Sequence, residues 1–511
     1  MKRTLSKFEQ IIETLPQDQQ QLVDEFFDEL ATRIILGPRD RNKMIQDFEN
    51  IIIYYLKNGL TLSAALARID VANLGGFYAR PATRWFRLDY SARIYPLSLN
   101  HEQMSLFRLS VYLKKDVIPE ILQMALTFTI KRFPQFATTL KKGFFWHYLD
   151  STKAHYPVEE EVGRPFVPIR VSLTGSKTFR VLYFNNRISL EFFHALTDGT
   201  GGTVFLKTLI REYFRLLGIE SSYDETTFDI NTAPDSDENN NEFENAPKTQ
   251  PSGFLSKKAV QMSGKVTRIK PCQIIHFKMD TDKLIQVAKA NNTTITGYIL
   301  TQIIIANKYA IEANAGDVVV QIPVNMRKFY PSKTIRNFTM YFGLRLALKD
   351  ITTTSNIISE VNNQLQTKAT KEKMMEMMYS VKQMVAKIRF IPLTIKTPIA
   401  RKIYGVLGER SYTNTFSNVG IVKFPAELEP HIESLDFVLG TAVLNRANCA
   451  LITFNNVTTL TIAKITLDDS FEERLLSLLT EDKIPLTIEG SDVYENVKYV
   501  SKRKKTKTTK K

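Results

Sequence analysis

Residues 188–218 read ISLEFFHALTDGTGGTVFLKTLIREYFRLLG and predict a strand, a tight turn and a helix. Apolar and polar residues alternate from 188 to 192, which is typical of a strand with one buried face. A glycine-rich turn follows, and apolar residues then recur at helical spacing until Gly218. The sequence therefore places His194 and Asp198 where a strand ends and a helix begins.

This junction is a chemically useful place for a histidine. A helix start carries unpaired N–H groups and a partial positive charge. An imidazole with an ordinary pKa of about 6.5 can take a proton from a hydroxyl group near neutral pH. We predict His194 as a catalytic base and assign Asp198 a structural role, in which it binds an arginine and fixes the loop. The sequence leaves three candidate partners open, namely Arg87, Arg93 and Arg327.

Residues 194–199, HALTDG, match the pattern H-x-x-x-D-G. With its strand before and its glycine-rich turn and helix after, the motif resembles the chloramphenicol acetyltransferase-like superfamily. That group includes alcohol acetyltransferases, polyketide-associated acyltransferases and peptide-synthetase condensation domains. Condensation domains usually carry a second histidine directly before the first, and Phe193 occupies that position here, which favours a free-standing acyltransferase. Two further stretches resemble the same enzymes, PVNMR at 323–327 followed by Asn337-Phe338, and SNVG at 417–420.

The resemblance implies a mixed α/β fold of two chloramphenicol acetyltransferase-like lobes with the active site between them. It implies a CoA-dependent O-acyltransferase, most like an alcohol acetyltransferase, that uses acetyl-CoA or another acyl-CoA as cosubstrate. The partners would be that acyl-CoA and a small alcohol or lipid acceptor, without a permanently bound cofactor or metal. Gly199 would permit the tight turn. Ser417, Asn418 and Asn337 are candidates for the oxyanion donor or the cleft lining.

Changes in composition along the chain divide it into five parts. The acidic stretch after residue 220 has little apolar content to offset the entropy of ordering, so we expect it to be flexible. The predicted parts are a helical N-terminal extension (1–79), a first lobe with the motif (80–220), an acidic flexible linker (221–255), a second lobe (256–498) and a basic disordered tail (499–511).

The overall composition fits a globular protein without a membrane span. Apolar residues make up 43% of the chain, yet no run of about 18 of them exists. The N-terminus lacks an apolar signal core and the only cysteines are Cys272 and Cys449, so we expect a cytoplasmic protein. The net charge of +15 comes partly from the tail, which we interpret as a solvated segment without a specific nucleic-acid partner.

Motifs of several other enzyme classes are missing. The sequence contains no G-x-S-x-G elbow of a serine hydrolase, no Cys/His spacing for zinc and no dinucleotide fingerprint. Two alternatives remain open, acyl transfer from a carrier protein and a non-catalytic binding protein on the same fold. The oligomeric state also stays open.

The region from Lys373 to Lys402 combines methionines, prolines and basic residues. Methionine fills irregular gaps in cores, so core packing is the simpler interpretation. The second interpretation is a basic, apolar segment for peripheral membrane contact.

Overall fold

The computed structural model describes residues 6–79, 85–98, 105–167, 175–251, 257–403, 409–442 and 444–494. The predicted basic tail, 499–511, lies outside these ranges, as do residues 80–84 at the predicted start of the first lobe. Within them, no helix is both long enough and apolar enough to cross a membrane.

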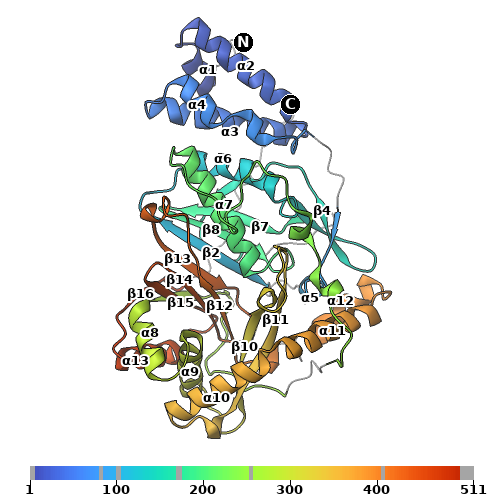
Figure 1. The fold of residues 1–511 in the computed structure, drawn as a ribbon, viewed down its shortest axis with the longest axis vertical. Helices are drawn as coiled ribbons and strands as arrows, with labels where there is room; N and C mark the ends of the chain where they lie inside the picture. The colour runs from blue at the N-terminus through green and yellow to red at the C-terminus, as the bar shows by residue number, and fades with distance from the viewer. Residues whose placement is uncertain are drawn as a thin grey trace, which may run out of the picture.

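The first lobe is built on a five-stranded sheet with the order β13-β2-β8-β7-β5. Its strands are β2 (Leu106–Leu113), β5 (Val158–Glu160), β7 (Phe179–Phe184), β8 (Arg187–Phe193) and β13 (Ile432–Leu439). β7 and β8 form a hairpin that turns at Asn185, which has a positive φ of 49°. Helices α6 (Pro119–Thr129) and α7 (Gly199–Leu216) lie together over this sheet (Figure 1).

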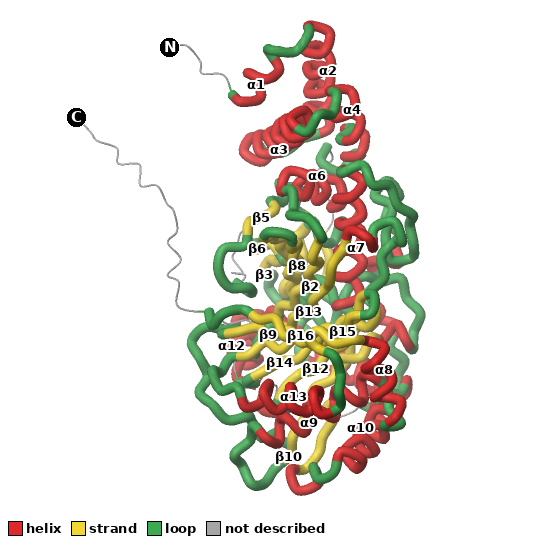
Figure 2. The backbone as a smooth tube through the Cα atoms, turned by 90° about the vertical axis from the view of Figure 1, so that its left-hand side faces the viewer, coloured by secondary structure: helices red, strands yellow, loops and turns green. Residues whose placement is uncertain are grey.

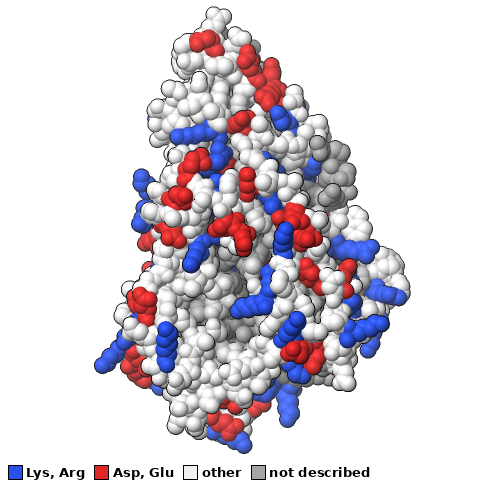
Figure 3. Space-filling view, viewed as in Figure 1, with Lys and Arg blue, Asp and Glu red and all other residues white. Residues whose placement is uncertain are grey.

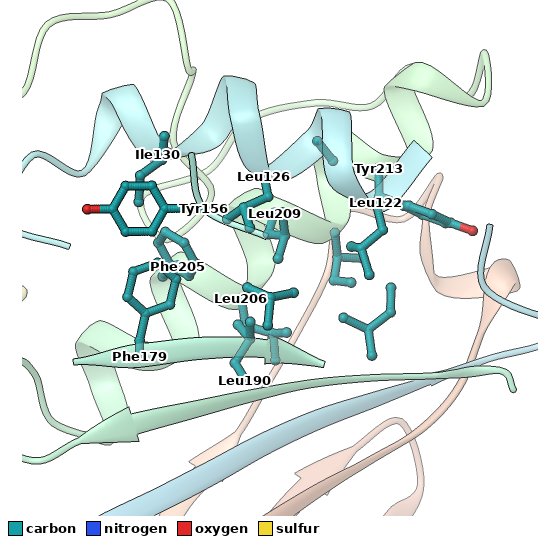
Figure 4. Packing of buried hydrophobic residues seen from close by; sticks show 14 of the residues in the cluster. Leu122, Leu126, Ile130, Tyr156, Phe179, Leu190, Phe205, Leu206, Leu209 and Tyr213 are labelled. Atoms are coloured by element: carbon teal, nitrogen blue, oxygen red, sulfur yellow. The ribbon is translucent and has the colours of Figure 1, made fainter. Parts of the chain in front are cut away.

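Aromatic side chains fill the space between these two helices and the sheet. Phe205 of α7 stacks on Phe136 with ring centroids 4.7 Å apart, and it meets Phe179 of β7 edge-on at 5.4 Å. Figure 4 shows the side chains of α6 and α7 meeting those of β7 and β8 in one cluster. This packing fixes where α7 begins, and therefore where the loop with His194 lies.

A small sheet with the order β1-β4-β3-β6 flanks the first lobe. Its strands are β1 (Trp85–Arg87), β3 (Thr138–Lys142), β4 (His147–Ser151) and β6 (Ser176–Lys177). The sequence predicts a strand over 144–149, but β4 begins only at His147 because the backbone turns at 143–146. That turn leaves Phe144 at its tip, 73% exposed.

The second lobe contains a seven-stranded sheet with the order β11-β10-β12-β14-β15-β9-β16. Its strands are β9 (Gln273–Asp280), β10 (Asp317–Asn325), β11 (Thr339–Ala347), β12 (Asn414–Ile421), β14 (Ala447–Phe454), β15 (Val457–Lys464) and β16 (Leu486–Gly490). The helices of this half are α8 (Thr281–Ala290), α9 (Ile295–Tyr309), α10 (Thr354–Lys368), α11 (Lys371–Lys387), α12 (Leu393–Ile403) and α13 (Ser470–Glu481).

One strand joins the two halves. β13 lies between β12 and β14 in the sequence, yet it pairs with β2 of the first lobe over the register Leu113 to Phe107. Its backbone also lies close to β14 and β15 of the second sheet. The first sheet is therefore completed by a segment from the second half of the chain.

The N-terminal helices cap the first lobe. They are α1 (Lys7–Ile12), α2 (Gln17–Arg33), α3 (Pro38–Lys57) and α4 (Leu62–Arg68), and Figure 2 shows them stacked beyond α6. Tyr55 of α3 donates a hydrogen bond to the Leu216 carbonyl at 2.7 Å, and Phe48 meets Phe128 of α6 at 6.2 Å. Their buried residues belong to the same core cluster as the first lobe.

The acidic segment differs from the flexible linker that the sequence predicts. Glu238 is buried and binds Arg132 of the first lobe, with both oxygens 2.6 Å from the guanidinium. The carbonyl of Glu238 accepts a hydrogen bond from Ile335 of the second half at 2.9 Å. Ion pairing and hydrogen bonds hold this segment where apolar content is low, which a count of hydrophobic residues does not reveal.

Candidate active site

His194 follows the last residue of β8, in the turn that leads to α7. Its N–H donates to the Ser105 carbonyl at 2.8 Å. The half-buried ring stacks on Tyr95 of α5 (Ile94–Ser98) with centroids 5.0 Å apart. Phe107 of β2 meets it edge-on at 5.1 Å. Two aromatic neighbours therefore fix the plane of the imidazole.

Asn337 of the second half reaches across to His194. Its Nδ2 lies 2.8 Å from the His194 carbonyl oxygen and 3.1 Å from Nδ1 of the ring. The ring also hydrogen-bonds to its own backbone carbonyl. These contacts engage the Nδ1 edge of the ring.

The surroundings of His194 keep its ring neutral near pH 7. Burial lowers the pKa of His194 below its usual range, since a charged imidazolium loses its hydration there. The charge of Asp198 and the bond to the backbone carbonyl act in the opposite direction and are outweighed. A neutral imidazole can accept a proton, as a general base must.

Asp198 is the N-cap of α7 and is 2% exposed. One carboxylate oxygen accepts from the Gly201 N–H at 3.1 Å. The other accepts from Arg327 Nη1 and from the Phe338 N–H, both at 2.8 Å, and from Thr339 at 3.2 Å. Burial alone would raise the pKa of Asp198, but Arg327 and the hydrogen bonds hold it below its usual range.

Arg327 is the candidate arginine that the structure places against Asp198. Its remaining N–H groups bind backbone carbonyls of Thr334 and Arg336 at 2.8–3.0 Å, which fixes the guanidinium. Arg93 instead lies over the rings of Tyr90 and Trp146, and Arg87 lies over Trp85. The Asp198–Arg327 pair therefore ties the His194 loop to the second half.

The glycines of the motif act differently from the expected tight turn. Gly199 is the first residue of α7 and has no positive φ, but a Cβ there would lie 2.9 Å from Val419 of β12. A Cβ on Gly201 would overlap the Ile335 carbonyl oxygen, which also accepts from the Thr197 hydroxyl at 2.6 Å. Close approach of the second half, rather than turn conformation, requires glycine at these positions.

The two candidates on β12 have different surroundings. Asn418 donates to Thr296 of α9 at 3.0 Å and accepts from the Gly420 N–H at 2.8 Å, so its side chain is directed to α9. Ser417 lies on the same strand face as Val419, the residue that meets Gly199. Of the three oxyanion candidates, Asn337 is the one in contact with His194.

Sequence reasoning missed three residues at this site. Tyr95 and Phe107 hold the ring, and Asn325 donates to Thr200 of α7 at 3.0 Å. Asn325 stands in the PVNMR stretch, two residues before Arg327, so this motif could have indicated it as a site residue. Tyr95 and Phe107 carry no local pattern that distinguishes them from core aromatics.

A separate polar cavity of about 180 Å³ lies at the far end of β8 from His194. Arg187, Tyr112, His276 and Asp436 are among its lining residues. Among the residues that the structure describes, no three His, Cys, Asp or Glu side chains gather in a way that could hold a metal ion.

Comparison with known proteins gives a likeness in fold. No protein-family model matches the chain, and no curated protein matches it. TRI101 of F. sporotrichioides, solved with coenzyme A and T-2, aligns with a TM-score of 0.54 over 79% of this chain and 99% of that one, at 11% identity. TRI101 of F. graminearum, complexed with coenzyme A and T-2 mycotoxin, gives 0.54 over 80% and 100%, at 10% identity.

The chain shares its fold with the TRI101 structures. Polyketide synthase associated protein 5 from Mycobacterium tuberculosis also aligns, with a TM-score of 0.50 over 78% of this chain and 98% of that one, at 11% identity. The mixed α/β fold class predicted from the sequence is thereby confirmed. At these identities the likeness concerns the fold alone.

Proposed function

We propose that this protein is a CoA-dependent O-acyltransferase of the alcohol acetyltransferase type, with His194 as its base. The observation that carries the proposal is the position of His194 between the two halves, with its Nδ1 edge engaged by Asn337 and its ring stacked on Tyr95. The TRI101 structures, which contain coenzyme A, support an acyl-CoA as the donor.

The proposed reaction is a direct transfer. The acceptor hydroxyl binds to Nε2 of His194, which removes its proton as the oxygen attacks the thioester carbonyl. The carbon–sulfur bond then breaks, and the departing thiolate takes the proton from the imidazolium. The products are an ester and free CoA. General base help supplies roughly 10²–10⁴-fold, so joining donor and acceptor in one site must supply much of the remaining rate.

Each neighbour of His194 has a proposed part in this reaction. Tyr95 and Phe107 keep the ring in one plane, and Asn337 holds the carbonyl that orients Nδ1–H. Ser417 remains a candidate to bind the oxyanion from the second lobe. The Asp198–Arg327 pair positions the His194 loop and does not contact the substrate. The polar atoms of both side chains already bind each other and the backbone.

The test is acyl transfer by purified protein. Acetyl-CoA and a panel of alcohols should give free CoA and ester, measured by chromatography, and His194→Ala should lose that activity. His431→Ala is a matched control, since His431 is half-buried against Phe214 and far from His194 in sequence. An acetylated carrier protein assayed in parallel separates carrier-dependent transfer. Full activity in His194→Ala would refute the mechanism.

A further inference from the structure

Several large apolar side chains are exposed together on one side of the molecule. They come from the turn between β3 and β4, from the connection between α11 and α12, and from α12 itself. We call this surface the apolar patch, and its members with their exposed fractions are Phe144 (73%), Phe145 (36%), Phe390 (70%), Ile391 (37%), Ile395 (53%) and Ile399 (52%). Contiguous exposed apolar surface of this kind marks an interaction site more often than single exposed residues do.

Specific contacts hold the two parts of the patch together. The Leu393 N–H donates to the Phe144 carbonyl, and Lys396 Nζ donates to the Phe145 carbonyl, each at 2.8 Å. The Phe145 and Phe390 rings lie 6.1 Å apart, edge to face. Two segments about 250 residues apart in sequence thus form one surface. Because these hydrogen bonds join the two segments, their apolar side chains are exposed as one surface and not as two separate loops.

Basic residues are exposed beside the apolar patch. From 377 to 408 the chain has six lysines and arginines and no aspartate or glutamate. Lys387, Arg389, Arg401 and Lys402 are exposed there, and Lys142 is exposed beside Phe144. Figure 3 shows Lys and Arg side chains gathered at the right-hand edge, where Figure 1 places α11 and α12. Burial and the charges of Lys142, Arg401 and Lys396 lower the pKa of His147 to about 4, so these cations lie close together.

The patch adjoins the element that covers His194. Helix α12 packs against α5, and α5 carries Tyr95, whose ring stacks on His194. Trp146 lies beneath the patch, with Lys396 Nζ 3.3 Å from its ring centroid. A molecule that enters the protein from the patch would therefore arrive beside the candidate site.

We propose that the apolar patch docks on the surface of an anionic lipid bilayer. Exposed Phe and Ile side chains would enter the boundary between headgroups and acyl chains, while the adjacent lysines and arginines bind acidic headgroups. If His194 catalyses acyl transfer as proposed above, a lipophilic alcohol from the bilayer is the matching class of acceptor.

The first measurement is vesicle flotation of the full chain. Binding should be strong to vesicles of phosphatidylcholine with phosphatidylserine, weaker to phosphatidylcholine alone, and reduced by salt. The chain has two tryptophans, Trp85 and Trp146, and Trp146 underlies the patch. The fluorescence emission of Trp146 should shift to shorter wavelength when the patch binds a vesicle.

Two double variants separate the two contributions. Phe144→Ser/Phe390→Ser should weaken partitioning about tenfold or more, since both rings lose apolar burial. Arg401→Gln/Lys402→Gln should weaken it about fivefold per charge on anionic vesicles only. Matched controls are Phe184→Ser and Lys114→Gln/Lys115→Gln, which change exposed residues at the other end of the first sheet and should leave binding unchanged.

Acyl transfer to a water-soluble alcohol distinguishes this inference from the proposed function. Patch variants should keep that activity in solution, and vesicle binding should persist in His194→Ala. Equal vesicle binding by the Phe144→Ser/Phe390→Ser variant and the parent chain would overturn the inference. So would light scattering that shows a dimer which only the patch variants dissolve, because the surface would then join two copies of the chain.

Discussion

Arg327 donates to Asp198 at 2.8 Å from the opposite half of the molecule, and both side chains are largely buried. The same carboxylate caps α7 through Gly201 and accepts from the backbone of Phe338. One side chain thus fixes a helix start, a loop and the approach of the second half. Its loss should affect stability and catalysis together.

We expect Asp198→Ala to destabilise the protein by about 3–5 kcal/mol, because it leaves Arg327 buried without its counter-charge. Glu29→Gln, which breaks the exposed pair with Arg33, should cost less than about 1 kcal/mol. Urea unfolding of both variants measures the difference. Asp198→Asn that melts like the parent chain and only raises KM would instead indicate direct contact with the acceptor.

The same pair should lose its contribution in acid. The folded pKa of Asp198 lies below its unfolded value, so its stabilising effect is complete above about pH 4 and disappears as pH falls through the folded pKa. The stability difference between the parent chain and Asp198→Asn should therefore shrink below pH 4. Unfolding at a series of pH values measures it.

The rate should follow the protonation of His194. Because burial lowers the pKa of this ring, the acid limb of kcat/KM should lie below pH 6.5, with a plateau at neutral pH. Protonation at lower pH removes the base, so activity falls there. An acid limb above pH 6.5 would contradict a desolvated imidazole.

Asn337→Ala should lower kcat about tenfold with a smaller change in KM, since one hydrogen bond that orients the His194 loop is lost. Asn337→Asp should move the acid limb to higher pH, because a carboxylate beside Nδ1 favours the charged ring. The matched control is Asn418→Ala, whose side chain binds Thr296. Equal effects of the two alanine variants would remove Asn337 from the site.

Gly201→Ala should destabilise the protein by about 2 kcal/mol, because the added methyl overlaps a backbone oxygen of the other half. Gly37→Ala is the comparison, since a Cβ there meets nothing within 4 Å. Its cost should stay below about 1 kcal/mol, the loss of a glycine cap. Thermal melting of both variants checks the order.

The sequence pattern predicted the features that depend on residues close together in the chain. The strand, the turn and the helix around His194 follow from the alternation and spacing of apolar residues, and the structure has all three. The choice of Arg327 over Arg87 and Arg93 depends on which residue faces Asp198 across the seam, and no spacing in the sequence encodes that.

Several other features depend on contacts between residues far apart in the sequence, and the sequence did not predict them. Asn337 and Asn418 both stand in motif-like stretches, but the backbone around each decides which one reaches His194. The membership of β13 in the first sheet depends on pairing between residues more than 300 positions apart. The burial of Glu238 likewise depends on Arg132, which lies far earlier in the chain.

The crossing of β13 limits how substrates can be admitted. Only residues 440–446 connect β13 to β14. For the two lobes to move far apart, the backbone hydrogen bonds between β13 and β2 would therefore have to break. A clamshell cycle of opening and closing is thereby disfavoured. Donor and acceptor would instead have to reach His194 while the two halves stay joined through β13.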